Sequence, residues 1–172
     1  MTDILEKLGG GDFRSIGRAN KIVQSVLKDR KLFREAFNGM FCSNPLVRMR
    51  AADVIEKVSE ERPELLQPYK SILLRNAPKV TQQEVQWHLA QMLGYLTLTS
   101  RERLRAASIL LGWLDSNPKS KIVIVMSIQT LWDFAKQEKS LRTEIYGRVQ
   151  QYLQSGSPAV KARCRILLKL GL

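Results

Sequence analysis

The stretch "NPLVRMRAADVI", residues 44–55, decides the fold, because a similar stretch, "SPAVKARCRILL", returns at residues 157–168. Both copies begin with a small polar residue and proline, continue with valine and a cation, and end in an aliphatic pair. One such match would be weak evidence. A series of matches at a regular spacing indicates a repeat architecture, which determines the fold before any propensity argument.

The apolar positions of the first copy return along the chain at steps of about 38 residues, with a shorter step at the N-terminal end. Within each copy the apolar residues are three and four positions apart, which is the spacing of an α-helix that buries one face. Five helices are therefore expected to share one template. Their apolar stripes lie at residues 18–26, 46–59, 84–97, 122–135 and 160–168.

Four further helices are expected between the five copies, separated from them by short turn-like stretches that contain proline. They are expected at residues 30–41, 64–76, 100–115 and 141–154. The β-branched run "KIVIVMSI", residues 121–128, could form a strand, but the next residues restore helical spacing, and we predict a buried helix. Helix pairs that repeat in this way predict an all-α solenoid of stacked antiparallel pairs, with about nine helices.

The two quoted stretches resemble the second-helix signature of HEAT repeats, which is proline, then valine and arginine, then alanine, then an aliphatic pair. The resemblance extends from about Ser15 to Leu170 and implies a right-handed solenoid. HEAT repeats often place an acid at the turn, where Asn44 and Ser157 stand here, so a regular Asp–Arg ladder is not expected. The tract "QQEVQWHLAQMLGYLTLTSRERLRA", residues 82–106, is also similar to a group of small bacterial HEAT-repeat proteins, a likeness that implies no activity.

The chain of 172 residues suits one domain, and we divide it into an N-terminal segment, 1–13, and a single repeat domain, 14–172. No apolar run is long enough to span a membrane, and the N-terminal residues do not form a secretion signal. Cys42 and Cys164 lie in apolar helical patterns and are expected to be free thiols in a reducing cytoplasm.

The net charge of +12 is distributed unevenly, since residues 119–172 hold ten basic and three acidic side chains. Such a surface attracts polyanions, although excess charge can also serve solubility alone. In the last helix, Lys161, Arg165 and Lys169 form a stripe, with Arg163 on another flank. These four cations are the expected polyanion-binding edge, and the structural alternative is a charged cap at the end of the solenoid.

No catalytic set, cofactor motif or metal site is recognisable. The chain has one histidine, no G-x-S-x-G motif and no zinc-type spacing of cysteine and histidine. It has a weaker likeness to HEAT-like alkylpurine DNA glycosylases, whose site combines tryptophan with an acid one helical turn later. The residues one turn after the three tryptophans are Gln91, Asn117 and Lys136, and none of them is acidic.

Positions beside the buried stripe are expected to line the concave groove of the solenoid, because the columns that contain His88 and Gln91 are mostly polar and long. Structural alternatives are packing between repeats for Trp87 and a partly buried, hydrogen-bonded side chain for His88. The candidate groove residues are Arg48, Arg50, Trp87, His88, Gln91 and Gln129.

These residues favour a non-catalytic scaffold or adaptor that binds a protein partner, with an acidic protein segment as the expected ligand. The alternative is sequence-independent nucleic-acid binding through phosphate contacts at the basic ends. The third hypothesis is a glycosylase activity, which an abasic product from methylated DNA would reveal.

Overall fold

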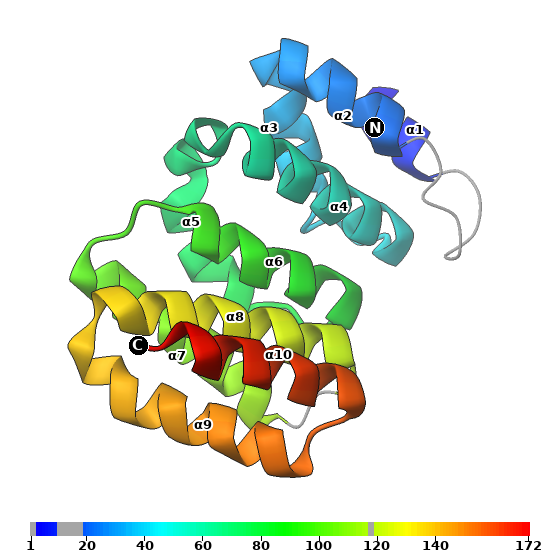
Figure 1. Cartoon of the computed structure of the whole chain (residues 1–172). Helices are drawn as coiled ribbons and strands as arrows, with labels where there is room; N and C mark the ends of the chain where they lie inside the picture. The colour runs from blue at the N-terminus through cyan, green and yellow to red at the C-terminus, as the bar shows by residue number, and fades with distance from the viewer. Residues whose placement is uncertain (1–2, 10–18, 117–118) are drawn as a thin grey trace.

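A computed structural model describes residues 3–9, 19–116 and 119–172 of the chain. These residues form ten α-helices and four short 3₁₀ turns, with 85% helix and no strand among them (Figure 1). The all-α prediction is therefore confirmed, including the β-branched run at 121–128, which lies inside a helix. None of the described helices is both long and apolar enough to cross a membrane.

Five of the helices coincide with the five predicted copies of the template, and we call them the even row. They are α2 (Ala19–Lys28), α4 (Pro45–Glu61), α6 (Gln83–Tyr95), α8 (Lys121–Gln137) and α10 (Pro158–Leu170). The helices between them form the odd row. They are α3 (Arg30–Gly39), α5 (Lys70–Asn76), α7 (Ser100–Asp115) and α9 (Arg142–Ser155).

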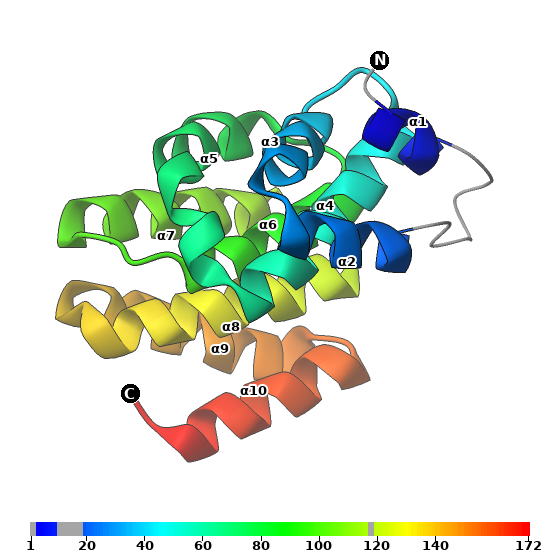
Figure 2. The ribbon, with the colours of Figure 1, turned by 90° about the horizontal axis from the view of Figure 1, so that it is seen from above.

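Each helix of the even row packs against the next one, in the order α2, α4, α6, α8 and α10 (Figures 1 and 2). The predicted stripe of α4 is fully enclosed, with Val47, Ala51, Val54 and Ile55 all buried. The corresponding stripe of α6 is also buried. Neighbours in the odd row touch one another much less than neighbours in the even row. The apolar core therefore follows the even row from one end of the chain to the other.

Local sequence fixes where α4 begins. The side chain of Asn44 accepts hydrogen bonds from the backbone N–H groups of Leu46 and Val47, at 2.9 and 3.3 Å. Pro45 occupies the first turn, where its missing N–H is not needed. The small polar residue of the repeat thus acts as a helix cap in this copy, which explains why no acid is required there.

The helix predicted at 64–76 is wrong in its first half. That region contains the 3₁₀ turns η1 (Pro63–Leu65) and η2 (Gln67–Tyr69), and the α-helix begins only at Lys70. Pro68 accounts for the difference, because its ring would clash with the carbonyl of Glu64 in a continuous α-helix. The odd row therefore has a short member at α5.

The tenth helix, α1 (Asp3–Gly9), lies within residues 1–13, which the sequence analysis separates from the repeat domain. It packs against α3 and α4, and its residues Ile4 and Leu8 are buried in the common core. A third 3₁₀ turn, η3 (Ala77–Lys79), precedes α6, and the fourth, η4 (Lys139–Leu141), precedes α9. The expected boundary between residues 13 and 14 lies outside the described residues.

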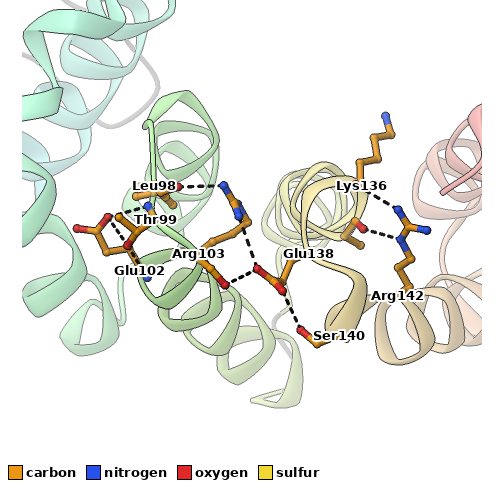
Figure 3. A network of polar contacts seen from close by, with 10 residues as sticks. Leu98, Thr99, Glu102, Arg103, Lys136, Glu138, Ser140 and Arg142 are labelled. Carbon is orange, nitrogen blue, oxygen red and sulfur yellow. Dashed lines mark hydrogen bonds and ion pairs between the residues drawn. The ribbon is translucent and has the colours of Figure 1, made fainter.

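Arginines near the start of α7 and α9 hold the ends of the preceding elements (Figure 3). Arg103 donates to the carbonyl of Leu98 at 2.9 Å, and Arg142 donates to the carbonyl of Ala135 at 3.1 Å. Arg103 also lies 3.6 Å from Glu138, which accepts hydrogen bonds from Ser100 at 2.6 Å and from Ser140 at 3.3 Å. Successive helix pairs are thus joined by polar contacts as well as by the core.

We predict that Gly156→Ala destabilises the fold by about 1–3 kcal/mol, because overpacking forces the backbone to shift. A Cβ at Gly156 would lie 2.5 Å from the carbonyl oxygen of Tyr152 and 2.9 Å from Val160, at the corner between α9 and α10. Gly147→Ala is the matched control, because nothing lies within 4 Å of its Cβ position. The control should be neutral or stabilising by about 0.5–1 kcal/mol, since alanine suits a helix interior better than glycine.

Urea denaturation monitored by circular dichroism measures both variants. Equal free energies of unfolding for Gly156→Ala and Gly147→Ala would show that the corner between α9 and α10 tolerates a methyl group.

Candidate binding face

Among the described residues, one flank of the even row is not covered by other helices, and we call it the open face. It consists of two columns of equivalent positions, all half-buried or exposed. The first column contains Met49, Trp87, Val125 and Ala162, and the second contains Asp53, Gln91, Gln129 and Ile166. Because α4, α6, α8 and α10 pack in this order, the columns cross four neighbouring helices.

Trp87, Gln91 and Gln129 lie in these two columns and are half-buried. Arg50 is enclosed instead, since its side chain is only 1% exposed and its Nη1 donates to the carbonyl oxygen of Leu8 at 2.7 Å. The bond fixes the C-terminal end of α1 to α4. Arg50 is therefore not available to a ligand, and its prediction as a groove residue is wrong.

His88 is also enclosed, with 2% exposure, so its prediction as a groove residue is wrong. The alternative of a buried side chain holds, but its Nδ1 has no hydrogen-bond partner among the described residues. Its Nδ1 lies 3.6 Å from Oε2 of the buried Glu56, whose other carboxylate oxygen accepts a 2.7 Å hydrogen bond from the hydroxyl of Tyr95. Glu56 comes from α4, and both partners come from α6. The three side chains form a polar contact between two helices of the even row.

The electrostatics of this cluster follow from its burial. Burial raises the pKa of Glu56, but the contacts with His88 and Tyr95 favour the charged carboxylate and bring the net pKa below its ordinary value. Burial and the neighbouring carboxylate together raise the pKa of the Tyr95 hydroxyl, so it stays protonated and donates. Glu56 is therefore held as a carboxylate, with the Tyr95 hydroxyl as its hydrogen-bond donor.

Arg48 is half-buried, and its guanidinium donates hydrogen bonds to the loops around it. It donates to Oε1 of Gln82 at 2.8 Å and to the carbonyl oxygens of Cys42 and Ser43 at 3.0 and 2.9 Å. Gln86, the equivalent residue of the next copy, donates to the carbonyl of Val80 at 2.9 Å. Both side chains satisfy backbone groups six residues earlier, so this position of the repeat supports the preceding loop.

Gln129 joins α8 to α10. Its Oε1 accepts a 2.9 Å hydrogen bond from Arg163, and its Nε2 donates to Asp133 at 2.8 Å. Arg163 is consequently half-buried and oriented along the open face. The sequence placed Arg163 in the polyanion edge and Gln129 in the groove, and the structure brings the two together.

The remaining cations of α10 are less constrained. Arg165 and Lys169 are exposed, Lys161 is half-buried, and none of the three has a hydrogen-bond or ion-pair partner among the described residues. Helix α10 contains four basic and no acidic side chains, whereas α6 contains one acid and no lysine or arginine. Positive charge on the even row is therefore concentrated at α10.

A groove of about 290 Å³ lies between α8 and α10. Its walls are mostly apolar, and Lys121 and Arg163 stand at its edges. The sequence analysis did not identify this groove, although the unbroken apolar run from Ile122 to Met126 was a signal. A helix that is apolar on several consecutive positions cannot bury all of them against one neighbour.

A larger cleft of about 830 Å³ lies between α7 and the residues before α6, where Arg105, Trp113 and Lys119 contribute to its lining. It holds no pair of acidic and basic groups suited to proton transfer. Trp132 is buried and stacks on Tyr146, so it does not offer a platform for a flipped base. Within the described ranges, no three histidine, cysteine or acidic side chains gather as metal ligands.

Comparisons of the chain with protein-family models, with curated proteins and with solved structures each gave no match.

We predict that Tyr95→Phe destabilises the fold by about 1.5–3 kcal/mol at pH 7, because a buried carboxylate loses its donor. The pKa of Glu56 is lower in the folded chain than in the unfolded chain. Its stabilisation is therefore present above the unfolded value of about 4.3 and is lost as the pH falls through the lower folded value. The difference between wild type and Tyr95→Phe should shrink in the same acidic range.

Urea denaturation at pH 7 and at stepwise lower pH measures this difference. Tyr146→Phe is the matched control, because Tyr146 is half exposed and its hydroxyl accepts only an exposed hydrogen bond from Gln150. Equal destabilisation by the two variants at pH 7 would contradict a structural role for the cluster around Glu56.

Proposed function

We propose that the chain is a HEAT-like α-solenoid that binds an acidic segment of a partner protein along the open face, without catalysing a reaction. The observation that carries the proposal is the combination of this face, which crosses four helices of the even row, with the accumulation of unpaired cations at α10. Closer packing in the even row than in the odd row supports a stack that curves toward the even row, as a solenoid does.

The open face has the composition of a recognition surface. Trp87 offers an aromatic side chain that is half-buried, and Gln91 follows it one helical turn later. Aromatic residues with a fixed orientation often dominate the free energy of protein binding. Cys42 and Cys164 are free thiols, which supports action in a reducing compartment such as the cytoplasm.

An acidic protein segment fits this face better than nucleic acid does. The aromatic side chains of the chain are few, and Trp87 stands next to Glu84 and Gln91 on α6 rather than among cations. A base-stacking platform needs aromatics interleaved with basic groups. Phosphate-backbone binding at α10 is the competing outcome of the experiment.

The test is fluorescence anisotropy of labelled probes, titrated at several salt concentrations. The probes are an acidic peptide of glutamate and alanine, single-stranded DNA, duplex DNA and RNA. We expect the peptide to bind, and we expect the triple change Lys161→Glu, Arg165→Glu and Lys169→Glu to weaken it at least about tenfold, because reversed charges repel the probe.

The matched control is a triple reversal on the odd row and its turns, at exposed cations that change the net charge equally. It consists of Arg101→Glu, Arg105→Glu and Lys139→Glu. Equal loss of binding in both triple variants would show that net charge alone attracts the peptide, which would contradict binding at α10. Binding of nucleic acid without binding of the peptide would replace the proposal by phosphate-backbone recognition.

A further inference from the structure

We infer that the groove between α8 and α10 is the docking site for an amphipathic acidic helix of the partner protein. This inference rests on the proposed function and locates it on two helices. Ile122 and Ile166 are 49% and 48% exposed and line the groove from its two sides. Val125 and Met126 on α8 and Ala159 and Ala162 on α10 complete its apolar lining.

The shape of the groove suits a helix. Ile122, Val125 and Met126 stand at positions i, i+3 and i+4 of α8, so they form one apolar flank. On α10, Ala159, Ala162 and Ile166 do the same at i, i+3 and i+7. The two alanines leave room between the larger side chains. A helix with leucines at the same spacing would lie between these flanks, as amphipathic helices do in other grooves.

The charged side chains around the groove indicate that the bound segment is negatively charged. Lys121 and Arg163 stand at the edge of the groove itself. Arg165 and Lys169 follow Ala162 by three and seven residues, so they border the same flank of α10, and both are exposed. No acidic side chain lines the groove or belongs to α10. Carboxylates on both margins of the bound helix would meet these cations.

A second copy of the chain is a poor occupant for the same reason. In a two-fold dimer the same patch meets itself, so the cations of one α10 would approach the cations of the other. The chain as a whole carries a net charge of +12, which adds to this repulsion. An acidic helix would meet the cations with opposite charge and would also cover the exposed isoleucines.

The test uses a labelled helical peptide of about 18 residues, five turns long, with leucine on one face and glutamate on the other. Two control peptides replace every glutamate by lysine or every leucine by serine. The protein variants are Ile122→Ser and Ile166→Ser. The matched controls are Ile72→Ser and Leu104→Ser, whose side chains are 39% and 40% exposed on α5 and α7, away from the groove.

We expect Ile122→Ser and Ile166→Ser each to weaken binding of the leucine–glutamate peptide about tenfold, because each removes apolar area buried on docking. The two controls should stay within about twofold of wild type. The lysine peptide should not bind, and the serine peptide should bind less tightly than the leucine peptide. Circular dichroism of the four variants at 25 °C should match wild type, because all four side chains are partly exposed.

Several outcomes would overturn the inference. If the groove variants bind the peptide as wild type does while the triple reversal at Lys161, Arg165 and Lys169 abolishes binding, the proposed function stands and the groove is not its site. If neither acidic peptide binds at low salt, both proposals fail. If sedimentation shows a dimer that Ile122→Ser dissociates, the groove is an interface between copies of the chain.

Discussion

The structure depends on burial of one apolar stripe between successive helices of the even row. An isolated helix pair exposes this stripe on at least one side, so each pair is stable only with a neighbour. Helix α4 lies between α2 and α6, and its residues Ala51, Val54 and Ile55 are fully enclosed. Helix α10 packs against α8 of the even row and against α9. Ile166 of α10 lies at the position equivalent to Gln91 and Gln129, where every helix of the even row from α4 onward is at least partly exposed, and here the side chain is apolar.

The same close packing decides which polar side chains can remain inside. A cation or carboxylate that loses water between helices must find a partner, because an unpaired buried charge is strongly destabilising. Arg50 has the carbonyl of Leu8, and Glu56 has the hydroxyl of Tyr95. These contacts join α1 to α4 and α4 to α6. The polar groups that look like ligand residues in the sequence thus serve the stack itself.

The repeat in the sequence predicted the helices well, because apolar spacing is a local property that the stack uses directly. Its five apolar stripes end within two residues of the ends of the five helices of the even row. It could not predict the fates of Arg50 and His88, since their partners stand 42 and 32 residues away and depend on tertiary packing. Pro68 by itself indicates that the helix at 64–76 cannot be continuous. The groove beside Ile122 depends on the tertiary packing of α8 and α10, which an apolar run does not specify.

Burial and charge together distinguish two parts of the even row. On α4 and α6, the long polar residues are engaged with neighbouring helices, and acidic side chains balance the cations. On α8 and α10, Gln129 and Arg163 are also engaged with each other, but two isoleucines stay exposed and α10 has no acidic side chain. Folding alone gains nothing from either feature, since exposed apolar area and repulsion between like charges are both unfavourable. A ligand that is apolar on one face and acidic on the other removes both costs at the same place.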